Sequence, residues 1–373
     1  MAKTIQEGEV LVKPGDITSF FLSVFEDVRK SQVKTIASLV YGLIRGKRAG
    51  VASIGRNMAG RAKEKHRIKR ADRYLGNDGI ELVKIKQRLL SLVAGGRKSV
   101  IVAIDWTDIG GGKRQVLYAA CITRGRAIPV MWEVADKAMG KGSQTAIEER
   151  FLEALKAAVS GDLRVIVVAD RGFGRVNFLR KLGDLGFGYV VRVTGSAWVE
   201  GRGFKGQLWD QTLRVGGATE FGEVYYQKEA RYRTRAVGFY EYGQKEPWLL
   251  VTNMGEAAEK IASWYGRRME IEEMFRDFKN SENGFGLRGL SLKANGRYDR
   301  LLLIMALAYY IFVLAGNLAE HLGLHRRFMA NTSRKRTLGL WRVGGFLIDK
   351  FKVDLERLLR PALNPVLEVS NWG

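Results

Sequence analysis

Two acidic side chains stand at the ends of two apolar segments and could share one site. Asp105 follows the run VIVAI and Asp170 follows the run VIVVA, and both runs are typical of buried strands. An ionised carboxylate at the inner end of a buried strand is costly unless a cation or a partner offsets it. The ends of adjacent strands could bring both carboxylates to one Mg²⁺ or Mn²⁺ ion, which prefers oxygen ligands. For either Asp alone, a capping or turn residue just past a strand is an equally good explanation.

A third candidate carboxylate, Glu272, lies in a segment that we expect to be one helix over residues 257–280. At about 100° of rotation per residue, Glu272 shares one narrow face with three other polar side chains, Tyr265, Arg268 and Lys279. Arg267 projects to the opposite side. An apolar stripe beside the polar face can dock on a sheet: Trp264, Ile271, Phe275 and Phe278. The alternative is an ordinary salt-bridged helix surface, where a Glu near Arg and Lys means no more than that.

The segments around these residues predict an α/β protein with a mixed sheet. Three β-branched segments joined by Gly-containing turns predict strands over 99–105, 114–122 and 126–134. Helix, strand, helix and strand are then expected over 145–159, 164–170, 173–185 and 187–193. Residues 195–247 are rich in Gly, Tyr, Arg and Trp and predict a small antiparallel β insertion. A strand over 248–253 and a mostly helical remainder follow.

The first part of the chain is helical in pattern and strongly basic. Apolar residues recur at helical spacing through residues 16–93, with a helix cap expected at Ser31. Residues 1–98 hold 21 Lys and Arg against 9 Asp and Glu, a net charge of +12 (21 − 9). Short basic helices favour a helix-turn-helix-like DNA binder, although a solvated helical face would look similar. Within the most basic stretch we expect three residues to contact DNA phosphates: Arg67, Lys69 and Arg70.

Composition restricts the partners and the compartment. With 373 residues we expect two or three domains, and the net charge of +23 favours a polyanion as partner, nucleic acid first. Cys121 is the only cysteine and the three histidines are scattered, which argues against a zinc site. The first residues are polar, so we expect no signal peptide. The apolar run 301–315 falls short of the ~20 residues that span a bilayer, so we expect a buried helix and a cytoplasmic protein without a membrane partner.

The spacing Tyr265-x2-Arg268-x3-Glu272-x6-Lys279 resembles the Tyr-Arg-Glu-Lys signature of a group of bacterial insertion-sequence DDE transposases. The motifs IDWTD at Asp105 and ADRGFG at Asp170 are similar to the two acidic motifs of that family. The resemblance covers roughly residues 99–320 and implies a ribonuclease-H-like catalytic domain. It also implies that the three acidic residues bind two Mg²⁺ or Mn²⁺ ions, which activate the attacking hydroxyl and stabilise the leaving oxygen.

Further roles follow from the resemblance. Tyr265, Arg268 and Lys279 would hold DNA phosphates near the cut. Trp248 stands where relatives stack a tryptophan on a flipped base, although a core tryptophan is as good an explanation. The short insertion, about 50 residues, puts a hairpin intermediate in question. The partners would be the terminal inverted repeats and target DNA, bound by a homodimer on the nucleoid.

The resulting domain prediction has four parts: a helical DNA-binding domain (1–98), a catalytic domain (99–194 and 248–320), the β insertion (195–247) and a C-terminal helical region (321–373). The predicted function is cut-and-paste DNA transposition. Two alternatives stay open. The same scaffold could be a metal-dependent nuclease without strand transfer, or a DNA-binding regulator with an inactive catalytic domain.

Overall fold

The computed structural model describes residues 13–138, 140, 142–201, 203–330, 332 and 337–350. Its helices are α1 (Pro14–Val24), α2 (Lys30–Gly46), α3 (Val51–Asn57), α4 (Glu64–Leu75), α5 (Leu82–Ala94), α6 (Ser143–Ala157), α7 (Val176–Asp184), α8 (Ala258–Gly266), α9 (Met269–Lys279), α10 (Asn295–His321) and α11 (Leu340–Lys350). Its strands are β1 (Ser99–Ile109), β2 (Arg114–Thr123), β3 (Arg126–Asp136), β4 (Arg164–Ala169), β5 (Gly188–Arg192), β6 (Trp198–Gly201), β7 (Phe204–Gln207), β8 (Gly217–Tyr226), β9 (Tyr232–Tyr240) and β10 (Trp248–Thr252). Short 3₁₀ turns are η2 (Gly110–Gly112), η3 (Arg171–Phe173), η4 (Leu208–Asp210), η5 (Leu287–Gly289) and η6 (Leu324–Phe328).

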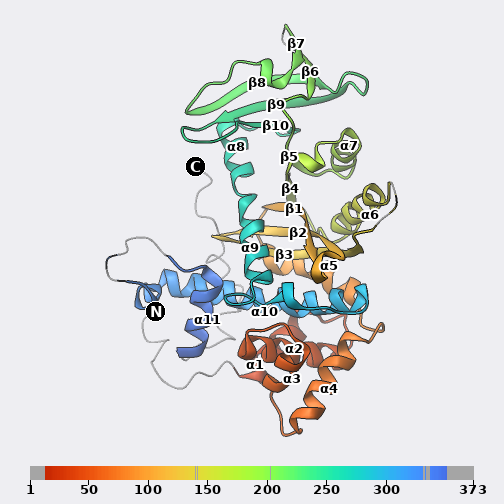
Figure 1. Ribbon diagram of the computed structural model, residues 1–373, viewed down its shortest axis with the longest axis vertical. Helices are drawn as coiled ribbons and strands as arrows, with labels where there is room; N and C mark the ends of the chain where they lie inside the picture. Colours follow the sequence, from red (N-terminus) through yellow and green to blue (C-terminus); the bar gives the residue numbers. More distant parts are fainter. Residues whose placement is uncertain are drawn as a thin grey trace.

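The strands form one mixed sheet of ten strands in the order β3-β2-β1-β4-β5-β10-β9-β8-β6-β7. β1, β2 and β3 are joined as two antiparallel hairpins, as the sequence predicted. β4 lies between β1 and β5 and is parallel to both, which explains its continuous apolar run: residues 165–169 are all buried. Helices α6 and α7 lie on one side of these central strands, and α8 and α9 lie on the other (Figure 1). The prediction of an α/β protein with a mixed sheet is confirmed.

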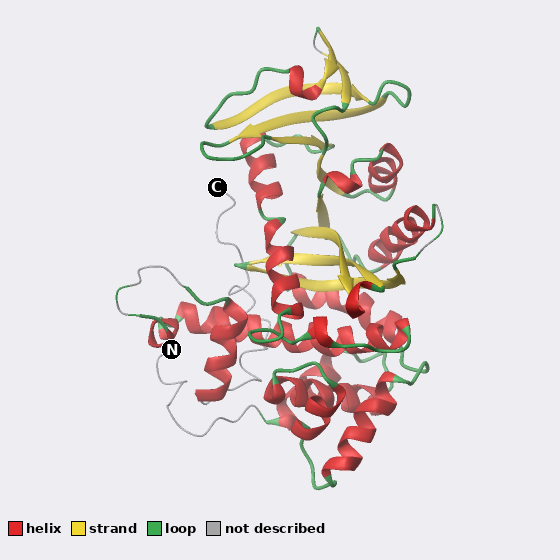
Figure 2. Ribbon diagram, viewed as in Figure 1, coloured by secondary structure: helices red, strands yellow, loops and turns green. Residues whose placement is uncertain are grey.

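The β insertion is antiparallel, as expected, but it is not separate from the main sheet. β10 pairs with β5 along one edge and with β9 along the other, so β9, β8, β6 and β7 continue the same sheet. Figure 2 shows these strands as an extension at the top of the molecule. The sequence could not show this continuity, because it depends on backbone hydrogen bonds between segments far apart in the chain.

Residues 257–280 form two helices, so the prediction of one continuous helix is wrong. The break falls after Gly266, where Arg267 N and Arg268 N donate to carbonyls three residues back, Trp264 O at 3.2 Å and Tyr265 O at 2.9 Å. Such i→i−3 bonds tighten the turn and shift the phase of the helix that follows. Glycine is a poor helix former, and a Cβ at Gly266 would lie 3.4 Å from the Trp248 ring. The predicted apolar stripe is nevertheless buried: Trp264, Ile271, Phe275 and Phe278.

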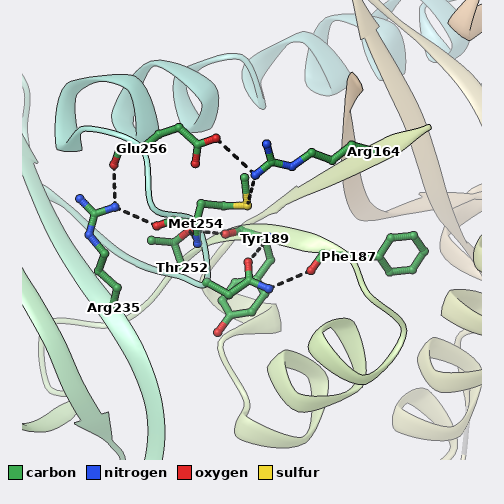
Figure 3. Close-up of polar contacts among 8 residues, drawn as sticks. Arg164, Phe187, Tyr189, Arg235, Thr252, Met254 and Glu256 are labelled. Carbon is green, nitrogen blue, oxygen red and sulfur yellow. Dashed lines mark hydrogen bonds and ion pairs between the residues drawn. The ribbon is translucent and has the colours of Figure 1, made fainter. Parts of the chain in front are cut away.

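The segment between β10 and α8 is fixed by polar contacts, which set the direction of α8 and of α9 after it (Figure 3). Asn253 donates to Phe187 O at 2.9 Å and accepts from Tyr189 N at 2.8 Å, so it extends the β5–β10 pairing by one residue. Arg235 on β9 donates to the carbonyls of Met254 and Glu256 at 2.8 and 2.6 Å. Arg164, at the start of β4, pairs with the Glu256 carboxylate at 3.3 Å. Three strands therefore hold the start of α8 in place.

Helix α10 lies between the sheet and the other helices of the lower part of the molecule (Figure 1). It packs against β3, α2 and α11, and it holds the predicted buried run 301–315. It is long and apolar enough to span a membrane by composition, but 94% of its most apolar window is buried inside the protein. This is the burial expected of a core helix.

The N-terminal helices α1 to α5 confirm the predicted helical region within the described residues. Ser31 is not the cap that the sequence suggested, because α2 already begins at Lys30 and its N-cap is Arg29. At the other end of the chain, η6 and α11 lie in the predicted C-terminal region, and residues 351–373 lie outside the described residues. The four domain boundaries stay predictions.

Candidate active site

Strand pairing places Asp105 beside Asp170. Ile104 on β1 is the register partner of Ala169 on β4, and each Asp is the next residue along its parallel strand. Asp105 Oδ1 accepts a hydrogen bond from Trp106 N at 2.8 Å, and Asp170 Oδ1 accepts one from Gly172 N at 2.9 Å. Each carboxylate therefore keeps other lone pairs available. The structure brings together two residues that are 65 positions apart (170 − 105) in the chain.

Arg268 joins the third carboxylate to this pair. Its Nη1 lies 3.4 Å from Asp105 Oδ2, and its Nη2 lies 2.7 Å from Glu272 Oε1. The Arg268 side chain is 11% exposed, whereas the Glu272 side chain is 44% exposed. The buried Nε of Arg268 has no hydrogen-bond partner among the described residues. A guanidinium with an unsatisfied donor thus sits between two of the predicted site carboxylates.

The electrostatics of Asp105 show that the three carboxylates act on one another. Burial raises the pKa of Asp105 to about 6, and the negative charge of Asp170 adds to the rise. Arg268 and the Trp106 amide oppose the rise, and Glu272 adds to it weakly. The Arg268 cation therefore compensates this negative charge only in part. A site of this kind is stabilised by additional positive charge.

The donor set fits a divalent metal, although the side chains are not yet gathered around one point. Asp105, Asp170 and Glu272 supply carboxylate oxygens only, which are the ligands of Mg²⁺ and Mn²⁺. Among the described residues no three His, Cys, Asp or Glu side chains are close enough to hold an ion together. The Arg268 guanidinium lies between the Asp105 and Glu272 carboxylates and contacts them through separate nitrogens. A bound cation would take over the charge that Arg268 now supplies.

The Tyr265 ring contacts Trp248 and also lies near the Arg268 guanidinium. Trp248 stacks on Phe239 at 5.3 Å between ring centroids and meets Tyr265 edge-on at 5.0 Å. Tyr265 is 3% exposed, and its ring lies 5.9 Å from the Arg268 guanidinium. Burial raises the pKa of Tyr265, and the charges of Arg268 and Arg192 oppose that rise. These contacts give Trp248 a packing role, and its role in base stacking stays a prediction.

Lys279 lies at the end of α9 and points to the strand that carries Asp105. Its Nζ donates to Thr107 Oγ1 at 2.6 Å, on β1 two residues beyond Asp105. Burial lowers the pKa of Lys279. Arg267, in contrast, donates to Thr123 O at 2.7 Å and pairs with Glu270, away from the site. The projected directions of Lys279 and Arg267 therefore agree with the structure despite the break before α9.

Other residues of the site were not identified from the sequence. Trp106 Nε1 donates to the buried carboxylate of Glu148 on α6 at 3.0 Å, and Arg175 pairs with the same carboxylate. This contact fixes β1 immediately after Asp105. Arg171, the residue after Asp170, lies 3.8 Å from the Glu246 carboxylate, which also accepts from Arg192 at 2.9 Å. In the sequence, Trp106 stands out only because it follows Asp105 in the motif IDWTD, and Glu148 only as one residue of a predicted helix. Neither position indicates that the two side chains contact each other.

The three predicted DNA contacts on α4 differ in their surroundings. Lys69 and Arg70 are exposed. Arg67 is half-buried, and its two Nη atoms donate to Gly60 O at 3.3 Å and Arg56 O at 3.1 Å. Arg67 therefore holds the connection between α3 and α4. Contact of these residues with DNA stays a prediction.

The fold and the site define an α/β protein with a large mixed sheet, acidic residues at the ends of its central strands and a basic helical region before it. Residues 96–311 match the family model described as "Transposase DDE domain", which is more than half of the 373 residues. The chain belongs to this family. Membership indicates a DNA-cleaving enzyme, and members of the family generally use divalent metal ions. No curated protein sequence matches the chain.

Proposed function

We propose that the chain is a DNA transposase that binds the terminal repeats of its element, cuts them and joins the freed ends to target DNA. We further propose that its catalytic domain is ribonuclease-H-like and belongs to the Tyr-Arg-Glu-Lys group. The strand order β3-β2-β1-β4-β5, in which β2 runs antiparallel to the other four strands, supports the fold proposal. The spacing of Tyr265, Arg268, Glu272 and Lys279 supports the group.

In this proposal Asp105, Asp170 and Glu272 hold two Mg²⁺ or Mn²⁺ ions. Bound metal would supply a nucleophile at neutral pH and charge stabilisation for the leaving oxygen. The protein contributes the position of each carboxylate: Asp105 and Asp170 through strand register, and Glu272 through α9. Arg268 compensates part of the negative charge before metal binds and can donate to a DNA phosphate afterwards, because its Nε has no partner among the described residues.

Tyr265, Arg268 and Lys279 would position DNA phosphates at the cut. Trp248 would lie beside the DNA strand that carries these phosphates. The basic face of α4, with Lys69 and Arg70, would contact duplex DNA outside the catalytic domain. We expect a homodimer that joins two ends in the cytoplasm, on nucleoid DNA.

The observation that carries the proposal is that strand register sets Asp105 beside Asp170 at the end of the central strands, while Arg268 links Asp105 to Glu272 on α9. The test is a joining assay. Purified protein, Mg²⁺, a labelled duplex with the element's terminal repeat and a supercoiled plasmid are incubated together. A transposase gives labelled 3′ ends covalently joined to the plasmid. Cutting without joined product would identify a nuclease instead, and binding without cutting would identify a regulator.

A further inference from the structure

An open pocket of about 520 Å³ begins one residue beyond Asp105. Its wall is the end of β1, which pairs with β4 only as far as Ile104 but with β2 as far as Ile109. The β1–β2 hairpin therefore projects past the parallel strands, and the η2 turn closes its tip. Two cations complete the lining, Lys279 at the end of α9 and Arg288 in η5. Pockets of roughly this size, about 300–1,000 Å³, accommodate ligands.

The charges in the pocket favour an anion. Lys279 is held over the β1 wall by its hydrogen bond to Thr107, and Arg288 is exposed. The pKa of Lys279 is lowered mainly by burial; Asp108 and Asp105 oppose this, and Arg288 lowers the pKa further, as expected of two cations close enough to repel. The acidic residue of the wall, Asp108, already pairs with Lys137 at 2.6 Å. A negatively charged ligand would relieve the repulsion between Lys279 and Arg288.

The η2 turn leaves bare backbone on the pocket wall. Gly111 and Gly112 have φ of 68° and 81°, a conformation that other residues rarely adopt. A Cβ built on either would have nothing within 4 Å, so open space faces both. Gly110 differs, because its Cβ would lie 2.7 Å from the Tyr298 hydroxyl oxygen. At Gly111 and Gly112 the chain can therefore approach another backbone closely.

We propose that this pocket binds the sugar–phosphate backbone of one DNA strand, with Arg288 contacting a phosphate and Gly111 allowing the strand to pass close to η2. The identity of the polymer rests on the proposed function. Lys279 follows Glu272 by seven residues (279 − 272), which is ~10 Å along a helix at about 1.5 Å per residue. The pocket therefore lies close enough to Glu272 for the contacted phosphate to be within a few nucleotides of the one that is cut.

The experiment uses the full-length protein and fluorescein-labelled duplexes with the element's terminal repeat. Each duplex carries one neutral methylphosphonate, placed one to six nucleotides from the cut on either strand, and affinity is measured by anisotropy. For the wild-type protein we expect a loss of roughly three- to tenfold at one position within a few nucleotides of the cut. Arg288→Ala should lose about as much on unmodified DNA, and the methylphosphonate at that position should then have no further effect.

Two further variants separate the pocket from general charge effects. Arg276→Ala is the matched control, since Arg276 lies on α9, is 67% exposed and pairs with Glu273. It should behave as wild type at every position. In Gly111→Asn, the new residue still tolerates a positive φ, but its side chain projects into the pocket. It should weaken DNA binding at an unchanged melting temperature.

The pocket assignment is overturned if the Arg288→Ala and methylphosphonate losses add at every position, or if Arg288→Ala matches Arg276→Ala. Cutting of unmodified duplex by wild type and Asp105→Asn in Mg²⁺ is measured alongside. If wild type cuts and Asp105→Asn does not, a negative result for Arg288 refutes the pocket alone. If wild type neither binds nor cuts, the proposed function and the pocket both fail.

Discussion

Replacing Asp105 by Asn should stabilise the fold at neutral pH while removing a metal ligand. The pKa of Asp105 is raised from 3.8 to about 6, chiefly by burial and then by Asp170. A carboxyl with a raised pKa favours the folded state while protonated, and this contribution is lost as the pH rises through about 6. Above that pH the charged form costs roughly 3 kcal/mol, because the pKa rises from 3.8 to about 6 and each tenfold change in the ionisation constant corresponds to ~1.36 kcal/mol. Asn imitates the neutral carboxyl and avoids that cost.

The assay is thermal melting of wild type and Asp105→Asn across pH 4 to pH 8, without and with Mg²⁺. We expect similar melting temperatures near pH 4 and a variant that melts a few degrees higher at pH 8. Added Mg²⁺ should stabilise the wild type above pH 6 and have little effect on the variant, because ligand binding to the folded state raises stability. An Asp105→Asn protein that is less stable than wild type at pH 8, or shifted equally at both pH values, would refute the electrostatic reasoning.

Three further outcomes are expected. The double variant Lys69→Ala, Arg70→Ala should bind duplex DNA more weakly, and the slope of log K against log salt concentration should become shallower by about 2. Anisotropy from about 50 to 200 mM salt measures this slope, and an unchanged slope would place the contact surface elsewhere. Arg268→Ala should reduce cutting by about 10²-fold or more, whereas Arg276→Ala should stay within about twofold, and equal losses in folded proteins would contradict the site. Trp248→Ala should lower stability by about 2–4 kcal/mol through lost packing, and Trp248→Phe should recover most of it; unchanged melting of Trp248→Ala would argue against the packing role.

Much of the fold could be predicted from local patterns. Asp105 and Asp170 each end an apolar run of strand type, and parallel pairing of β1 with β4 then placed them side by side. Helix α10 was predicted from its length and apolar content, and the antiparallel strands of the insertion from short alternating segments. These features depend on periodicity and turn residues, which are local properties of the sequence.

Long-range contacts could not be predicted in the same way. Arg268 was expected to hold a DNA phosphate, which stays a prediction, but its bridge between Asp105 and Glu272 was not predicted, because Asp105 is 163 residues away. Arg67 was predicted to contact DNA because of its charge, yet it donates to backbone carbonyls of Arg56 in α3 and Gly60 in the loop after it. Arg267 points away from the site as projected, but its bond to Thr123 O gives it a structural role that the sequence did not show. For each of these arginines, the role depends on a partner that is distant in the sequence or contributed by the backbone, and the sequence pattern does not reveal that partner.

The most direct test of the site is single-turnover cutting of the element's terminal repeat in Mg²⁺ by Asp170→Asn, Glu272→Gln and a neighbouring control, Glu273→Gln. Glu273 lies on the same helix but pairs with Arg126 and Arg276, away from the carboxylates. We predict that the first two variants lose about 10³-fold or more in rate while DNA affinity stays within about threefold, and that Glu273→Gln cuts as wild type. Near wild-type cutting by Glu272→Gln, or an equal loss in folded Glu273→Gln, would contradict the assignment.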